Sequence, residues 1–325
     1  MKRRQFLEQA LTGLGVVTAD SLLLGSSWGQ ESAANGAELP FSTDPVALVR
    51  LTDEITTSRI GLGTGVCASM RQCNLTKMDK DVALDLIRFC YDSGIRYYDM
   101  ADLYNTHGLV AEALAGRPRD SYTLGSKVWC HAGGLPEEER PLAEVSVERF
   151  LKELKTDYLD LVQLHCMSNE HWEAELADQM ESLERLKKRG LIRAHGVSCH
   201  AISALSKAAV NPWVDTIHAR LNTADTRMDG SWDDNVAVLQ TARANGKGII
   251  IMKILGEGSI KDPEERRKST DAVTRLECKN VMIVGFEKRE HVTEFLDNVA
   301  ATLKDMELSR KATVAGRRGH NWRMA

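Results

Sequence analysis

The stretch IRYYDMADLY, residues 95–104, joins a short β-rich run to one acid and one phenol. Asp99 stands at the tip of this run, and Tyr104 follows five residues later. An ionised carboxylate is rarely buried without a partner, so Asp99 at the end of a buried strand requires a cation nearby. The stretch therefore predicts a strand with the side chains of Asp99 and Tyr104 at the same end.

The next two apolar runs along the chain supply further ionisable groups. SYTLGSKVW (121–129) carries Lys127 near its end, and YLDLVQLHC (158–166) carries His165. Lys127 is the nearest good candidate for the cation that Asp99 requires. An acid, a phenol, a lysine and a histidine at the carboxyl ends of three successive strands predict a proton-transfer site.

Outward from this segment, runs of strand-like sequence alternate with runs of helical spacing. The predicted strands lie at 60–67, 95–101, 121–129, 158–166, 192–200, 214–222, 246–255 and 280–286. The predicted helices lie at 79–94, 107–116, 137–155, 172–190, 201–210, 232–245, 262–277 and 288–303. Such alternation indicates parallel strands with right-handed crossovers.

Eight such units in about 270 residues match a closed (β/α)8 TIM barrel better than an open sheet. The G-x-G-x-x-G fingerprint of an open dinucleotide-binding sheet is absent, because Gly61, Gly63 and Gly65 alternate inside a strand. Ahead of the barrel, VALVRL and ITTSRI predict a β-hairpin. In TIM barrels the chemistry sits at the carboxyl ends of the strands. The candidates at these ends are Asp99, Tyr104, Lys127, His165, Ser198 and Lys253.

Composition narrows the class of protein. The 325 residues are 43% hydrophobic and 27% charged, without a break in composition, which favours one large domain. The net charge of −4 and the scattered Lys and Arg residues offer no stripe for nucleic acid. The seven cysteines form no C-x-x-C pair, so no zinc or iron–sulfur site is suggested, and they are interpreted as buried free thiols.

The N-terminal segment reads as an export signal. Arg3 and Arg4 precede a weakly apolar stretch that is too short and polar to span a bilayer, so no stable membrane span is expected. The segment resembles the bacterial twin-arginine signal, although Glu8 stands where a lysine is often found. We expect a signal at 1–30, a linker at 31–45 and a barrel domain at 46–325. The resemblance implies export to the periplasm by the twin-arginine machinery; an ordinary basic start would leave the protein cytoplasmic.

Several segments together resemble the aldo/keto reductase family. In chain order they are SRIGLGTG, GIRYYDMADLYNTHGLVAEAL, LGSK, VERFLKELKTDYLDLVQLHCM, LKKRGLIRAHGVSCH, MKILGEG and IVGF. The likeness covers about residues 46–300 and implies NAD(P)H-dependent reduction of an aldehyde, ketone or sugar carbonyl. Residue by residue, the catalytic tetrad of the family falls on Asp99, Tyr104, Lys127 and His165.

The chemistry of carbonyl reduction suits these four residues. Hydride transfer builds negative charge on the carbonyl oxygen, which must then receive a proton. Tyr104 would be the donor, and Lys127 would lower the pKa of its phenol toward the working pH. Asp99 would hold the lysine protonated and in place, while His165 would orient the carbonyl oxygen by a hydrogen bond.

The resemblance also implies a bound nicotinamide dinucleotide, NADP(H) being favoured and NAD(H) the alternative. The matching positions are Gly63, Thr64, Asp99, Ser198, Cys199, His218, Leu255, Gly256, Gly258, Gly285 and Lys288. Three features depart from the common pattern. Cys199 and His218 replace an Asn and a Gln, Met252-Lys253 stands where an aromatic residue often stacks, and Glu287 lies where a cation would meet a 2′-phosphate.

Two other functions fit parts of the sequence. The replaced carboxamide contacts are consistent with a dinucleotide-binding or sensing barrel with little turnover. His107, His165, His200 and His218 with Asp99 are the residue types of a metal-dependent isomerase or hydrolase, but no H-x-H or H-x-x-x-H spacing supports one. The long loops at 130–142 and 223–233 and the tail at 306–325 carry no motif that identifies a substrate.

Overall fold

The computed structural model describes residues 39–320, with side chains as far as residue 313. The signal predicted at 1–30 lies outside the described residues. Among the helices that are described, none combines the length and the apolar character needed to cross a membrane.

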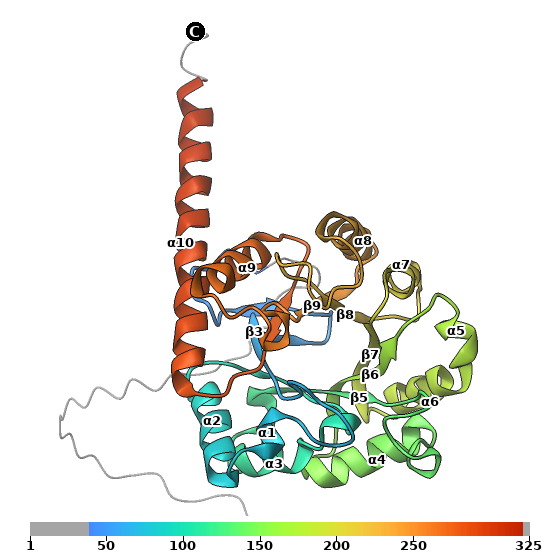
Figure 1. Ribbon diagram of the computed structural model, residues 1–325. Helices are drawn as coiled ribbons and strands as arrows, with labels where there is room; N and C mark the ends of the chain where they lie inside the picture. The colour runs from blue at the N-terminus through green and yellow to red at the C-terminus, as the bar shows by residue number, and fades with distance from the viewer. Residues whose placement is uncertain (1–38, 321–325) are drawn as a thin grey trace, which may run out of the picture. The chain divides into compact units, whose positions relative to one another are not determined.

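Eight parallel strands close into a barrel, which confirms the predicted TIM-barrel fold (Figure 1). Around the barrel they follow the order β10-β3-β4-β5-β6-β7-β8-β9. The strands are β3 (Ile60–Gly63), β4 (Tyr97–Asp99), β5 (Thr123–Val128), β6 (Leu159–Met167), β7 (Ile192–Cys199), β8 (Thr216–Arg220), β9 (Gly248–Met252) and β10 (Val281–Val284). Because all eight strands of the closed barrel are parallel, their carboxyl ends lie at one rim.

The predicted N-terminal hairpin is also confirmed. β1 (Leu48–Arg50) pairs antiparallel with β2 (Thr56–Ser58). Leu51 and Ile55, from the turn between them, pack with inward-facing side chains of the barrel. The Leu51 carbonyl approaches Gly248, the first residue of β9. The hairpin therefore closes the amino end of the barrel and leaves the opposite rim for chemistry.

The helices surround the barrel and follow the strands as predicted, with three differences in length (Figure 1). They are α1 (Asn74–Lys77), α2 (Lys80–Asp92), α3 (His107–Ala113), α4 (Ala143–Leu154), α5 (Trp172–Glu175), α6 (Ala177–Lys188), α7 (Ile202–Val210), α8 (Trp232–Ala244), α9 (Pro263–Arg275) and α10 (Arg289–His320). The short 3₁₀ helices are η1 (Asp102–Tyr104), η2 (Arg119–Ser121), η3 (Glu137–Glu139) and η4 (Gly256–Gly258).

The three differences correct the sequence prediction. The helix expected at 137–155 is a 3₁₀ turn followed by α4, because Pro141 disfavours helical geometry in the residue before it. The helix expected at 172–190 is split at Leu176 into α5 and α6. The last helix does not end at residue 303 but runs to His320, packing along α9 and α2 over its earlier part (Figure 1).

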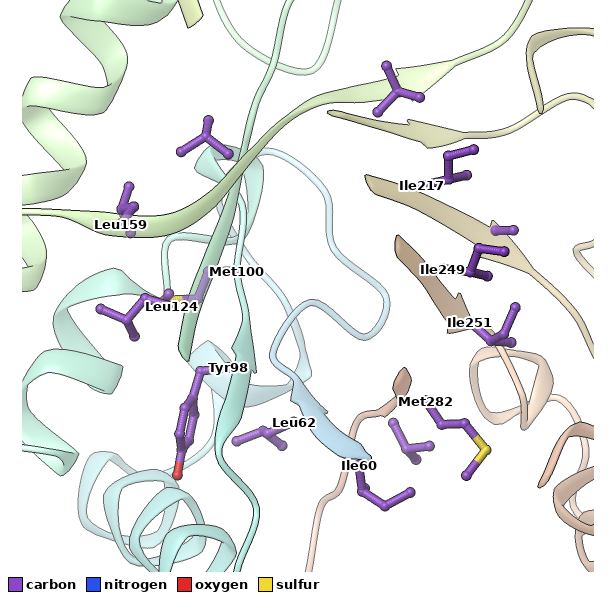
Figure 2. Packing of buried hydrophobic residues seen from close by; sticks show 14 of the residues in the cluster. Ile60, Leu62, Tyr98, Met100, Leu124, Leu159, Ile217, Ile249, Ile251 and Met282 are labelled. Atoms are coloured by element: carbon purple, nitrogen blue, oxygen red, sulfur yellow. The ribbon is translucent and has the colours of Figure 1, made fainter. Parts of the chain in front are cut away.

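The main hydrophobic core lies between the strands and the helices around them. It includes Ile60, Tyr98, Leu124 and Ile251 from the strands, and Figure 2 shows part of this cluster. A second cluster, with Tyr97, Leu161 and Ile250, fills the barrel interior. Because successive strand residues point to opposite faces, alternate residues of each strand face either the helices or the interior.

Candidate active site

The carboxyl ends of three neighbouring strands and the turn after β4 carry the four residues singled out in the sequence. Asp99 is the last residue of β4, Lys127 lies near the end of β5, and His165 lies near the end of β6. Tyr104 ends the 3₁₀ helix η1, which begins three residues after Asp99. The structure brings all four side chains to the same rim of the barrel.

Asp99 and Lys127 form a buried ion pair. Lys127 Nζ donates to Asp99 Oδ1 at 2.6 Å and to the Met100 carbonyl at 3.0 Å. Both residues are almost completely buried, at 3% and 1% exposure. Burial alone raises the pKa of the Asp99 carboxyl, but the Lys127 ammonium and the His218 imidazole outweigh it and hold that pKa below its ordinary value. The carboxylate is therefore ionised at neutral pH.

Tyr104 lies beside this pair and against His165. Its hydroxyl is 3.4 Å from His165 Nε2, and Lys127 Nζ is 5.2 Å from the centroid of its ring. The ring also packs on Gly65, where an added Cβ would lie 2.3 Å from Cε2 of the phenol. Any side chain at residue 65 would therefore displace Tyr104.

The pKa of Tyr104 is raised well above its ordinary value, mainly by burial, with the Asp99 charge adding to the shift. The expectation that Lys127 lowers this pKa in the resting site is thus not met, because burial dominates. Tyr104 is fully protonated at neutral pH, as a proton donor must be. Transfer to an alkoxide, a stronger base than a phenolate, would still be favourable.

His165 is held as a neutral imidazole. Burial first, and then the nearby Lys127 charge, lower its pKa well below the ordinary value. Its Nδ1 is buried and has no hydrogen-bond partner among the described residues. Trp129 stands edge-on at 5.3 Å between ring centroids, and His131 Nε2 lies 2.7 Å from the His165 carbonyl. A neutral imidazole in this position is able to donate one hydrogen bond from Nε2 to a carbonyl oxygen.

A bulge at the end of β6 shapes the rim next to His165. The pairing of β6 with β7 shifts register between Leu164 and Met167, and Cys166 adopts a positive φ of 66°. The Cys166 N–H donates to Ser198 Oγ at 2.9 Å. Such bulges re-aim side chains at the rims of barrels. Ser198, a predicted dinucleotide contact, thus supports the bulge through a hydrogen bond.

A cavity of about 380 Å³ opens beside the tetrad. Its lining includes Asp99 and Tyr104 together with residues of α9 and α10, whereas Lys127 and His165 are not among the lining residues. Of the predicted dinucleotide contacts, the cavity is lined by Gly63, Asp99, Leu255, Gly258 and Gly285. The cavity therefore has both Asp99 and the last two helices in its walls.

The other predicted contacts lie outside the cavity lining. Thr64 Oγ1 donates to the Asp99 carbonyl at 2.8 Å, and His218 contacts the Asp99 carboxylate. Cys199 belongs to the core between strands and helices. Gly256 and Lys288 are also absent from the lining, and Lys288 is exposed. Successive residues of a strand point to opposite faces of the sheet. Since Ser198 faces the barrel interior, Cys199 beside it faces the helices.

Glu257 is a contact that the sequence did not suggest. Its Oε1 accepts from Lys253 Nζ at 2.6 Å and from the Cys67 N–H at 3.2 Å, and its Oε2 lies 3.2 Å from Arg227. One carboxylate thereby joins the loops that follow β3, β8 and β9 at the cavity wall. Its neighbours come from distant parts of the chain, so no local motif reveals it.

No group of three or more His, Cys, Asp or Glu side chains is arranged as metal ligands within residues 39–320. What the rim does present is a buried lysine–carboxylate pair, a protonated phenol and a neutral imidazole, and of these residues Asp99 and Tyr104 line the cavity. These features define a barrel enzyme of the kind that transfers protons to a bound organic substrate.

Comparison with known proteins gives the family. The family model for the aldo/keto reductase family matches residues 59–312, and the chain belongs to this family. Methylglyoxal reductase DkgB of Salmonella typhimurium is 27% identical over 190 residues, 57% of this chain and 67% of that protein. The NADH-specific methylglyoxal reductase of Escherichia coli is 26% identical over 227 residues, 64% of this chain and 66% of that protein.

Other matches are shorter or structural. An oxidoreductase of Bacillus subtilis, YqkF, is 30% identical over 154 residues, 45% of this chain, and the match spans about half of that relative, 46% of its length. A solved Pseudomonas aeruginosa structure assigned to the aldo-keto reductases has a TM-score of 0.65 and 25% identity, covering 80% of this chain and 96% of that chain. A Klebsiella pneumoniae aldo/keto reductase in complex with NADP and acetate shares the fold, with a TM-score of 0.57 and 22% identity over 78% of this chain and 89% of that chain.

Proposed function

We propose that this protein is an NAD(P)H-dependent carbonyl reductase that uses Tyr104 as its proton donor. The observation that carries the proposal is the convergence of Tyr104, His165 and the Asp99–Lys127 pair at one rim of the barrel, where Asp99 and Tyr104 line the cavity. When bound, a reduced nicotinamide supplies the hydride. The residues of the chain then have to orient the carbonyl, stabilise the developing charge and deliver one proton.

Each residue has a role set by its contacts. His165 directs a hydrogen bond to the carbonyl oxygen from its neutral ring, while the Tyr104 hydroxyl gives up its proton as the alkoxide forms. Lys127 lies beside the phenol and offsets the negative charge left on it. Asp99 fixes the lysine by the 2.6 Å contact. The substrate that we propose is a small aldehyde or ketone, since the relatives include methylglyoxal reductases.

The lining of the cavity suits a dinucleotide. It includes Asp99 and Tyr104 of the tetrad, and glycines from the ends of β3 and β10 that let a ligand approach the backbone. Phe286 and Phe295, with ring centroids 6.0 Å apart, line the wall near α10 and offer apolar surface. The nicotinamide would lie at the Asp99 end and the adenosine near α9 and α10.

A panel assay tests the proposal. Purified protein would be titrated with NADH and NADPH, and oxidation of the bound dinucleotide would then be followed with aldehydes, ketones and sugars. The sensing alternative is favoured by one observation, that Cys199 and His218 lie outside the cavity lining. Tight dinucleotide binding without oxidation across the panel would support that alternative and contradict the reductase.

The charged residues on the α10 side of the cavity bear on the choice between NADH and NADPH. Glu287 and Glu294 both line it. Of the cations in the same lining, Arg266 is 2.9 Å from Glu294 and is already paired, and Lys261 is another. Arg289 points to Asp85, and Lys288 lies outside the lining. A 2′-phosphate would add about two negative charges near these carboxylates. Since Glu287 opposes the charge of Lys261, we expect no strong preference for NADPH over NADH.

Glu287→Lys tests whether the charge of Glu287 affects the choice of dinucleotide. Reversing one charge beside the adenosine end should shift the ratio of the two dissociation constants toward NADPH by about tenfold at low salt. Fluorescence titrations of both dinucleotides measure the ratio. The matched control is Glu290→Lys, which makes the same charge change at an exposed residue outside the cavity. An equal shift of this ratio in both variants, or a wild type that binds NADPH much more tightly than NADH, would contradict the role assigned to Glu287.

We also propose that the chain is exported by the twin-arginine route, on the strength of the Arg3-Arg4 segment alone. This route moves folded proteins, so a dinucleotide would be loaded before export. In fractionated bacterial cells we expect processed protein in the periplasm, and Arg3→Lys/Arg4→Lys should retain the precursor in the cytoplasm. Full-length protein found only in the cytoplasm of wild-type cells would rule the proposal out.

A further inference from the structure

His218 makes a contact that the family resemblance did not suggest. It lies in the middle of β8 with its side chain in the barrel interior, 1% exposed. Its Nε2 is 2.9 Å from Asp99 Oδ1, the same oxygen that accepts from Lys127 Nζ. The resemblance placed His218 among the dinucleotide contacts, whereas the structure points its ring at the carboxylate of the ion pair.

The protonation of this cluster follows from its burial. Burial lowers the pKa of His218, and although the Asp99 charge opposes the shift, the imidazole is neutral at neutral pH. A neutral imidazole that faces a carboxylate donates from the nitrogen nearest to it, here Nε2. Its Nδ1 has no partner among the described residues, which agrees with that tautomer. The cluster then holds one negative and one positive charge and is neutral overall.

The contact spans the barrel. In the closed order of strands, β4 and β8 are four positions apart out of eight and therefore face each other across the interior. Lys127 holds Asp99 from the neighbouring strand β5, while His218 holds it from the opposite wall. The Asp99 backbone is fixed as well, since its carbonyl accepts from the Thr64 N–H at 3.0 Å. The carboxylate is thus held by two side chains, and the backbone that carries it by a third contact.

We propose that His218 is a positioning residue, which acts through Asp99 to hold Lys127 under the phenol of Tyr104 and makes no direct contact with the dinucleotide. The proposal rests on the proposed reductase function. A charge-assisted hydrogen bond is stronger than a neutral one and has a defined direction. Without it the carboxylate is free to rotate, and the lysine that it carries leaves its position beside the phenol.

His218→Leu and His218→Gln test the proposal together. Leucine removes the donor at similar volume, whereas glutamine restores an N–H donor on a more flexible side chain. We expect His218→Leu to lower kcat by about 10- to 100-fold with the dinucleotide Kd within about threefold of wild type, and His218→Gln to recover most of kcat. Steady-state kinetics give the split between kcat and KM, and fluorescence titration gives Kd.

The matched control removes a buried imidazole from the other side of the sheet. His195 of β7 faces away from the interior and stacks on Trp213 at 4.2 Å, so His195→Leu should leave kcat unchanged. Thermal unfolding of all variants shows whether they fold. For the wild type, ¹⁵N NMR of the histidine rings should report His218 as a neutral imidazole protonated at Nε2, a result independent of turnover.

Several outcomes overturn the inference. A weakened dinucleotide Kd with unchanged kcat in His218→Leu would make His218 a direct cofactor contact. A kcat within threefold of wild type, or failure of His218→Gln to recover activity in a folded protein, would also contradict it. If such results accompany an inactive Tyr104→Phe, the reductase function stands and only this role of His218 is lost. If the wild-type protein shows no turnover, both the reductase function and this role of His218 are contradicted.

Discussion

Tyr104→Phe should lower kcat by about 10²- to 10⁴-fold while the dinucleotide Kd stays within about threefold of wild type. The substitution removes only the hydroxyl, so the ring keeps its packing on Gly65. The hydrogen bond to His165 is long, at 3.4 Å, and its loss should cost stability about 1 kcal/mol or less. What is lost is the proton that the alkoxide must receive. Steady-state rates with a reactive aldehyde measure the effect.

The matched control for this variant is Tyr98→Phe. Tyr98 is also fully buried, but it packs in the core outside the barrel, and its hydroxyl donates to the Ile95 carbonyl at 3.3 Å. Removing that hydroxyl makes the same chemical change away from the rim, so turnover should be kept. Similar rates for wild type and Tyr104→Phe would reject Tyr104 as the proton donor.

Lys127→Met should abolish turnover and also destabilise the fold, by about 3–5 kcal/mol. The lysine is the cation that allows Asp99 to be ionised at 3% exposure. Without it, a buried carboxylate is left with the neutral His218 as its side-chain partner. Denaturant unfolding measures the loss of stability, and dinucleotide oxidation measures the loss of activity.

A double variant separates the two effects of Lys127. Asp99→Asn/Lys127→Met removes both charges, so no uncompensated ion remains in the interior and much of the lost stability should return. Turnover should not return, because the cation beside Tyr104 is still missing. If the single variant is as stable as wild type, or the double variant regains activity, the account of the ion pair is wrong.

Most of the fold could be predicted from the sequence. Helical and strand periods alternate clearly, and the eight units follow from that alternation. The predicted helix bounds were wrong where single residues interrupt the helical periodicity of apolar residues. Pro141 delays the start of α4, and the backbone leaves helical geometry at Leu176. The extension of α10 to His320 was missed because its later half has too few apolar residues to show a period.

The site was partly predictable for a physical reason. A carboxylate at the tip of a buried strand must have a cationic partner, and this argument led directly to Lys127. The direction of the pKa shift at Tyr104 depends on how much of the ring is buried, which no local pattern gives. Because side chains alternate along a strand, assigning Ser198 to the barrel interior would have placed Cys199 in the core outside it. The contact of His218 with Asp99 crosses the barrel, so it could be predicted only once the order of strands in the closed barrel was known.

The most direct test of the central claim is a single-turnover experiment on the enzyme loaded with NADH. Rapid mixing with methylglyoxal, followed by the absorbance of the reduced nicotinamide, reports hydride transfer itself. We expect wild type to oxidise one bound dinucleotide for each carbonyl reduced, and Tyr104→Phe to bind the dinucleotide normally but lose this phase. Full binding without oxidation by wild type across small aldehydes and ketones, or an unchanged phase in Tyr104→Phe, would contradict the account.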